Sequence, residues 1–139
     1  MSVGFQGEVS PLQAWSALQG AGKAQLLDVR TEEEWAFVGL PDLTGLDREV
    51  IAVPWQIYPK MEGNSAFLDQ VTTKGLRKDE PVYVLCRSGV RSLKAARFLA
   101  EAGFTTWNVI DGFEGALDGL GHRGKVGGWK ATGLPWRQR

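Results

Sequence analysis

The chain has 139 residues, which is enough for one domain with its own hydrophobic core and too few for two ordinary domains. Lys plus Arg and Asp plus Glu each number 16, so the net charge is zero, which argues against binding nucleic acid or an anionic membrane through the overall field but not against a local basic patch. The single cysteine excludes an internal disulfide, and with one histidine beside it too few soft ligands remain for a zinc centre, so we expect neither a metal nor a cofactor.

The first predicted helix begins after Ser10, which is a typical N-cap residue, with Pro11 at the first helical position and Gln13 completing a capping box. Apolar residues then recur at three-residue spacing, which is typical of an amphipathic helix. The short apolar run 25–29 follows and predicts a strand.

A second capping box, formed by Thr31 and Glu34, predicts a short helix. The side chains that we expect this helix to bury are Trp35, Phe37 and Val38. Residues 50–53 predict a further strand, and the next helix is expected to have Asn64 or Ser65 as its cap.

The clearest strand and the clearest helix lie in the second half of the chain. Residues 82–85 form a continuous apolar run of the kind that is buried on both faces, and after a short loop the pattern predicts a helix over about 91–102. A last strand is predicted over 107–110. Strands that alternate with helices indicate an α/β fold with a parallel sheet. We expect a single domain over 1–139.

Cys86 stands between the predicted buried strand and the clearest helix. The residues that follow it are Arg87, Ser88, Gly89, Val90, Arg91 and Ser92. Ligands bind at the carboxyl ends of strands in a parallel sheet, and the N–H groups of a tight loop with a helix N-terminus behind them provide positive potential. Four basic residues and no acid between positions 87 and 97 add to that potential. Because such surroundings favour thiolate over thiol, we predict that Cys86 is a catalytic nucleophile.

A simpler interpretation of Cys86 is that it is a small buried residue at a strand end, and for the cysteine alone this would be preferred. A core cysteine, however, requires neither a glycine turn nor flanking arginines. Lys94 and Arg97 fit a solvated helix face, whereas Arg87 and Arg91 lie in the loop itself.

Residues 86–92, preceded by the apolar run 82–85, resemble the active-site loop of the rhodanese family of sulfurtransferases. Three further segments are similar to that family and occur in the same order, namely 26–35, 102–113 and 128–135. The resemblance covers nearly the whole chain, from about Ser10 to Trp136. It implies an α/β fold with one mostly parallel central sheet flanked by helices on both faces, and a domain core over about 10–136.

The resemblance also implies a reaction. Cys86 would take a sulfane sulfur from a small anionic donor such as thiosulfate, become a persulfide, and pass the sulfur to a thiophilic acceptor, either cyanide or a thiol. The loop backbone would hold the persulfide, and Arg87 and Arg91 would meet the anionic donor. Asp28 and Arg30 match family positions that we interpret as mainly structural, with a role in orienting the loop.

The chain departs from the family after the acidic helix. Many relatives have Gly-His-Ile-Pro-Gly-Ala there, whereas this chain has Gly-Leu-Pro-Asp-Leu at 39–43, without a histidine. The segment 41–64 is expected to shape a wall of the pocket, and Trp55 is the tryptophan that we expect near it. Because this segment is unusual, the identities of donor and acceptor stay open.

Two other functions remain open at this stage. Cysteine-dependent phosphatases and arsenate reductases also combine a cysteine, an anion-sized loop and an arginine, but they place one residue more between the two than the four that separate Cys86 from Arg91. No aspartate is placed as a general acid. The other alternative is a non-catalytic binding module on the same fold, although such modules often lack the cysteine. His122 is interpreted as a surface residue rather than as a partner of Cys86.

The N-terminal residues lack the basic start and apolar stretch of a signal peptide, and no apolar run reaches membrane-spanning length. We therefore expect a cytoplasmic protein with no membrane partner. The sequence does not specify an oligomeric state or a pathway.

Overall fold

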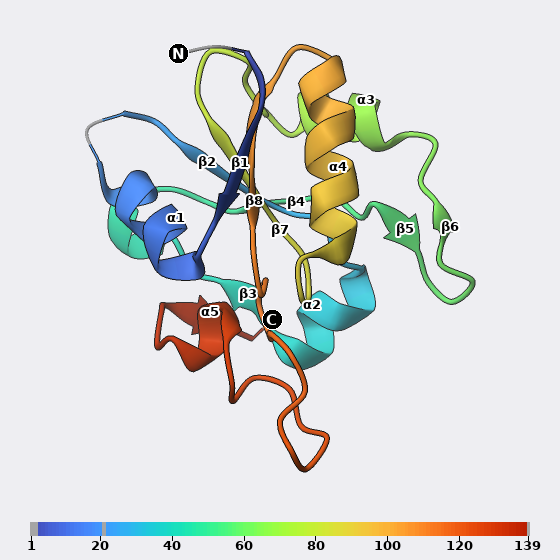
Figure 1. Cartoon of the computed structure of the whole chain (residues 1–139). Coiled ribbons are helices and arrows are strands. Elements are labelled where there is room, and N and C mark those ends of the chain that lie inside the picture. The colour runs from blue at the N-terminus through green and yellow to red at the C-terminus, as the bar shows by residue number, and fades with distance from the viewer. Residues whose placement is uncertain (1–2, 21, 139) are drawn as a thin grey trace.

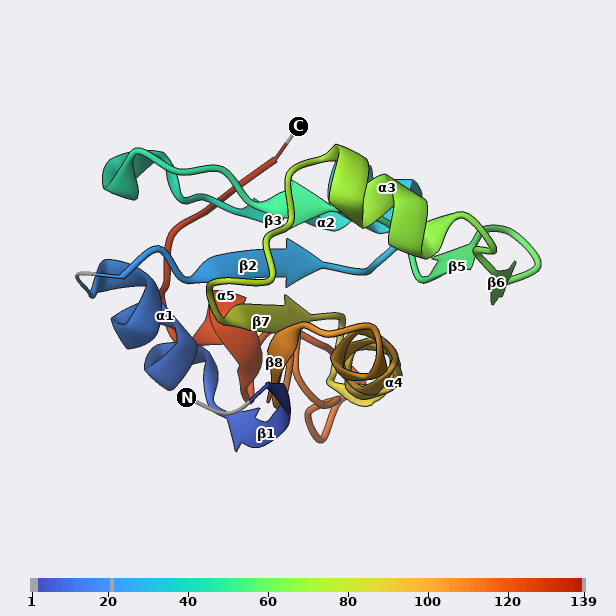
Figure 2. The same ribbon diagram turned by 90° about the horizontal axis from the view of Figure 1, so that it is seen from above.

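The centre of the molecule is a five-stranded parallel sheet, as described by a computed structural model of residues 3–20 and 22–138. The strand order is β1-β8-β7-β2-β4, and every neighbouring pair is parallel (Figures 1 and 2). The five strands are β1 (Gly4–Val9), β2 (Gln25–Asp28), β4 (Ile51–Ala52), β7 (Val82–Leu85) and β8 (Thr105–Val109). Residues 1–2, 21 and 139 of the predicted domain lie outside the described residues.

Helices cover both faces of this sheet, which confirms the predicted fold class. On one face lie α1 (Pro11–Gln19) and α5 (Gly128–Ala131), and on the other lie α3 (Phe67–Thr73) and α4 (Val90–Glu101) (Figure 1). The smaller elements are α2 (Glu32–Val38), a 3-10 turn (Thr44–Leu46), the antiparallel pair β3 (Leu40–Pro41) and β9 (Trp136–Arg137), and the antiparallel pair β5 (Gln56–Ile57) and β6 (Glu62–Gly63).

Strand β7 lies in the middle of the sheet and is buried at every position, as its continuous apolar run predicts. Its side chains alternate between the two faces. Val82 and Val84 belong to the core beneath α3 and α4, whereas Tyr83 and Leu85 belong to the core beneath α1 and α5. Two cores on one sheet fix the position of the loop that follows β7.

Both predicted capping boxes are present. Ser10 Oγ accepts the Gln13 N–H at 3.1 Å, and Thr31 Oγ1 accepts the Glu34 N–H at 3.3 Å. Trp35 is buried as predicted. The prediction that Phe37 is buried is wrong, since its side chain is 81% exposed on the outer face of α2.

Two element boundaries also differ from the prediction. Ala66 is the N-cap residue of α3, without a side-chain hydrogen bond. Asn64 instead stands two residues before it, and its side-chain oxygen accepts the Ala66 N–H at 3.1 Å. Strand β8 begins at Thr105, two residues earlier than predicted, because threonines extend the apolar run into the sheet.

Strand β1 was not predicted from the sequence. It pairs in parallel with β8 along one edge of the sheet, with a register shift between Phe5 and Gly7. Glycines and the polar residues Gln6 and Glu8 interrupt its apolar pattern, so it lacks the run that marks a buried strand.

Because the strands are parallel, the carboxyl ends of β2, β7 and β8 meet at one edge of the sheet. The segment leading to α2 follows β2, the Cys86 loop follows β7, and residues 110–115 follow β8. In the part of the chain that the structure describes, no helix is both long and apolar enough to cross a membrane.

Candidate active site

Cys86 lies at the carboxyl end of β7, with only 1% of its surface exposed, at the base of a cavity of about 400 Å³. Residues 87, 88, 90 and 91 of the loop line this cavity together with Glu34, Gln56 and Met61. These three come from α2 and from the hairpin of β5 and β6 with the turn between them. The sequence therefore places a buried sulfur where three separate segments converge.

The Cys86 sulfur faces the start of α4. Its Sγ atom accepts the Gly89 N–H at 3.1 Å, and Gly89 is the N-cap residue of this twelve-residue helix. Gly89 has a φ of 106°, a left-handed conformation that favours glycine. A negative charge on the sulfur is thus stabilised by a loop N–H and by the positive end of the helix dipole.

The segment after β8 holds the loop from behind. The Cys86 carbonyl accepts the Phe113 N–H at 2.8 Å, and the Arg87 carbonyl accepts the N–H groups of Glu114 at 3.0 Å and Gly115 at 3.1 Å. Because the C=O and N–H of a planar trans peptide point in opposite directions, these contacts turn the N–H groups of residues 87 and 88 away from the segment. They are thereby available to an anion bound above the sulfur.

Gly112 allows this close approach. It has a φ of 55°, and a Cβ atom at this position would overlap the Cys86 carbonyl oxygen and lie 2.7 Å from the Arg87 carbonyl carbon. Those atoms are backbone and cannot move aside cheaply, so a side chain at residue 112 is incompatible with the observed loop.

A buried polar pair stands behind the sulfur. Ser92 Oγ lies 3.2 Å from Cys86 Sγ and 2.5 Å from Asn108 Oδ1, and the single hydroxyl proton serves one of these acceptors at a time. Asn108 donates its two amide hydrogens to Glu8 Oε2 at 2.9 Å and to the Gly89 carbonyl at 3.1 Å. Asn108 therefore connects strand β8 with the turn of the loop.

Arg91 makes a two-point ion pair with Glu34. Its Nη1 and Nη2 atoms lie 2.6 and 2.9 Å from the two carboxylate oxygens. The two side chains are 16% and 20% exposed at the cavity wall. Such planar pairing is a strong form of charge-assisted hydrogen bond, and it fixes the guanidinium in one orientation.

Each partner shifts the pKa of the other. Burial alone would raise the pKa of Glu34, but the hydrogen bonds and charge of Arg91 outweigh burial, and the pKa of this carboxyl lies below its usual range. Burial opposes the charge of Arg91, but the Glu34 carboxylate outweighs it and holds the pKa of Arg91 above its usual range. Both groups are therefore charged at neutral pH.

Asp28 and Arg30 form a fully buried ion pair at the end of β2, with Nη2 and Oδ2 2.7 Å apart. The same Nη2 atom donates to the Gly39 carbonyl at 2.7 Å, and the guanidinium carbon lies 4.2 Å from the centroid of the Phe113 ring. Arg30 thus contacts the segment that holds the loop. Its role in orienting that loop stays a prediction.

The comparisons with known proteins agree with this geometry. Thiosulfate sulfurtransferase GlpE of Actinobacillus pleuropneumoniae is 32% identical over 129 residues, which cover 92% of this chain and 90% of that protein. The crystal structure of Rv0390 from M. tuberculosis superposes on this chain with a TM-score of 0.89 and a sequence identity of 49%. The match covers 97% of this chain and 99% of that chain. The chain belongs to the rhodanese-like family.

Two further similarities cover most of the chain. The family model described as STR4 middle domain matches residues 6–139. An uncharacterized protein of Rickettsia conorii is 38% identical over 126 residues, which cover 90% of this chain and 92% of that protein. These similarities thus extend over nearly the whole chain.

The rhodanese-like loop brings most predicted site residues together. Cys86, Arg87, Ser88, Val90 and Arg91 line one cavity. Gly89 donates to the sulfur, and Ser92 lies beside it, buried under the loop. Their functional roles stay predictions.

Two expectations about aromatic and imidazole groups have different outcomes. Trp55 is not at the cavity of Cys86, because its ring packs on Phe67 and Phe98 with centroids 5.0 and 5.5 Å away. The 41–64 segment lines that cavity with Gln56 and Met61 instead. His122 is exposed, as predicted, with Nδ1 4.0 Å from a carboxylate oxygen of Asp118.

Sequence reasoning missed Asn108 and part of the role of Glu34. Glu34 was assigned to the helix cap, which it does form, but its contact with Arg91 spans 57 positions. Asn108 lies on a strand expected to be apolar, and a polar residue there was the available signal. Among the residues that the structure describes, no group of three His, Cys, Asp or Glu side chains could hold a metal ion.

The ion pair gives a testable expectation for stability. Glu34→Gln keeps the capping box, since glutamine also caps, but removes one charge of the pair. At pH 7 we expect the free energy of unfolding of this variant to be about 1 kcal/mol lower than that of the wild type. Because the pKa of Glu34 is lower in the folded than in the unfolded protein, its ionised carboxylate stabilises the fold at pH values above the unfolded pKa of about 4.3. This stabilisation is lost as the pH falls through the folded-state pKa.

The difference between the two proteins should therefore disappear in acid. Urea unfolding at pH 7 and at the lowest pH at which both proteins remain folded measures it. A difference that is equal at the two pH values would contradict the assigned charge state of Glu34.

Proposed function

We propose that the protein is a sulfurtransferase in which Cys86 carries a sulfane sulfur as a persulfide. The observation that carries this proposal is the Cys86 sulfur at the base of a cavity, where it accepts a hydrogen bond from the N–H of Gly89 at the start of α4. Membership of the rhodanese-like family, in which a 32% identical relative is a thiosulfate sulfurtransferase, supports it.

The reaction balances without an external oxidant. In the first half, the Cys86 thiolate attacks the sulfane sulfur of a donor, a new S–S bond forms, and the donor leaves as sulfite if it was thiosulfate or as a thiolate if it was an organic persulfide. In the second half, cyanide or a thiolate attacks the outer sulfur of the Cys86 persulfide. The S–S bond breaks, and the electron pair returns to Cys86.

The loop is suited to a small charged sulfur. The terminal sulfur of a Cys86 persulfide would extend into the cavity, where the N–H groups of residues 87 and 88 are free of the segment behind the loop. Arg87 is exposed at the rim of the cavity and would meet the incoming donor. Arg91 contributes through its pairing with Glu34.

The choice of substrate distinguishes a sulfurtransferase from the phosphatase alternative. With four residues between Cys86 and Arg91, the loop is short for a phosphoryl group, and Arg91 is held by Glu34. We expect the wild type to form thiocyanate from a sulfane donor and cyanide, and to hydrolyse an aryl phosphate no faster than buffer does. Parallel colorimetric assays of thiocyanate and of the released phenol measure both reactions.

The result that would reverse this choice is faster release of phenol than of thiocyanate. Neither product above the buffer rate would favour the non-catalytic binding module on this fold. Inserting one glycine after Ser88 offers a control, since it gives the loop the phosphatase length and should abolish sulfur transfer.

A further inference from the structure

The charges around Cys86 are more nearly balanced than the basic loop sequence indicates. Arg91 is bound at two points by Glu34, and in the part of the chain that the structure describes Arg87 has no ion-pair partner. Two arginines and one glutamate leave a net charge of one positive unit at the cavity, before the charge of a Cys86 thiolate is counted. An incoming dianion would therefore meet one guanidinium group, that of Arg87, that is not already paired with a carboxylate.

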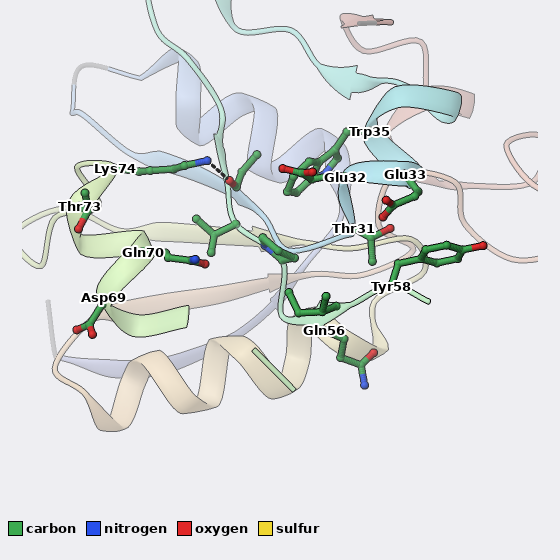
Figure 3. A pocket seen from close by; sticks show the side chains of 14 residues that line it. Thr31, Glu32, Glu33, Trp35, Gln56, Tyr58, Asp69, Gln70, Thr73 and Lys74 are labelled. Carbon is green, nitrogen blue, oxygen red and sulfur yellow. Dashed lines mark hydrogen bonds between the residues drawn. The ribbon is translucent and has the colours of Figure 1, made fainter. Parts of the chain in front are cut away.

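The surface next to the cavity is acidic. A second cavity of about 580 Å³ lies between α2 and α3, and the two cavities share Gln56 in their walls. Figure 3 shows Glu32 and Glu33 from α2 on one side of it and Lys74, which directly follows α3, on the other. The Lys74 ammonium donates to the Ala52 carbonyl at 2.7 Å, and Asp69 is a third carboxylate in the lining.

This arrangement has consequences for a sulfur donor. Thiosulfate carries two negative charges and has no organic group, whereas a persulfide, R–S–SH, carries at most one negative charge at its sulfur. A carboxylate at the cavity wall and further carboxylates beyond it repel a dianion more than a monoanion. The larger cavity meanwhile offers room for the organic group R, with apolar lining from residues 52–54 and Trp35.

Resting on the proposed function, we propose that Glu34 makes the Cys86 site selective for organic persulfides over dianionic thiosulfate by neutralising Arg91. The Cys86 thiolate attacks the outer sulfur of R–S–SH, the S–S bond of the donor breaks, and R–S⁻ leaves with the electron pair. Cys86 retains the outer sulfur and its proton as Cys86–S–SH. No oxidant is needed, and a single negative charge passes from the Cys86 sulfur to the leaving thiolate.

Glu34→Gln tests this proposal because it releases the guanidinium of Arg91 and keeps the helix cap. The measured quantity is the second-order rate constant for persulfide formation at Cys86, from thiosulfate and from 2-hydroxyethyl persulfide. We expect the variant to react with thiosulfate about tenfold faster than the wild type at low salt, and with the organic persulfide within about twofold of it. The increase should shrink at high salt.

Glu101→Gln is the control. It removes the same charge from an exposed position at the C-terminal end of α4, and Glu101 lines neither of the two cavities. We expect it to change neither rate constant by more than about twofold. An increase equal to that of Glu34→Gln would overturn the proposal, because a general field and not the release of Arg91 would then set the preference.

Arg91→Met gives a second and opposite test. It leaves Glu34 unpaired at the cavity, so the reaction with thiosulfate should slow about tenfold more than the reaction with the organic persulfide. An unchanged ratio of the two rate constants in both the Glu34 and the Arg91 variants would overturn this inference alone. A wild type that takes sulfur from neither donor would instead overturn the proposed function, and the inference with it.

Discussion

Replacing Cys86 by serine is expected to abolish sulfur transfer from every donor, with a loss of at least about a thousandfold to the uncatalysed rate. The sulfur is the group on which the reaction takes place, and no other cysteine is present in the chain. A serine hydroxyl is a far weaker nucleophile and cannot store a sulfane sulfur. Thiocyanate formation with thiosulfate or an organic persulfide as donor measures the loss.

The fold should tolerate this substitution. A serine oxygen can accept the Gly89 N–H that the sulfur accepts now, so the free energy of unfolding should change by no more than about 1 kcal/mol. Urea unfolding of both proteins provides this control. Sulfur transfer by a folded Cys86→Ser protein would show that the persulfide is not formed at this residue.

Gly112→Ala is expected to be the most damaging single-methyl substitution near the site. The added Cβ would overlap the Cys86 carbonyl oxygen, so either the loop or the segment behind it must move. A displaced loop loses the alignment of its N–H groups, and we expect kcat/KM to fall by about a hundredfold or more. The clash and the left-handed backbone should together cost about 3 kcal/mol or more of unfolding free energy.

Gly133→Ala separates these two effects. Gly133 also has a positive φ, of 83°, but no atom lies within 4 Å of a Cβ built there. This control should lose only the conformational part, about 1 kcal/mol, and retain full activity. Equal losses of stability in the two variants would contradict a steric role for Gly112 against the loop.

The central features of the fold were predictable because each is a local pattern. The apolar run 82–85 marks a strand buried on both faces, and the two capping boxes mark the starts of α1 and α2. Strand β1 was not predictable in this way, since it is held by pairing with β8 and not by an apolar run of its own. The exposure of Phe37 likewise depends on which face of α2 meets the sheet.

In the site, too, local features were predictable from the sequence and long-range contacts were not. The Cys86 loop is contiguous in sequence, so its position between a strand and a helix was apparent. The contacts that tune it are long-range: Arg91 with Glu34, Ser92 with Asn108, and the Cys86 carbonyl with the Phe113 N–H. Charge counting along the loop predicted two arginines for an anion, but the fold brings a carboxylate to one of them.

The most direct test of the central claim is the intact mass of the protein before and after exposure to a sulfane sulfur donor, and again after cyanide. The mass should rise by one sulfur atom with an organic persulfide or with thiosulfate, and cyanide should return it to its starting value. Cys86→Ser should show neither change. A wild-type mass that stays constant with both donors, in a folded protein with a free thiol, would contradict the assignment of Cys86 as a sulfur carrier.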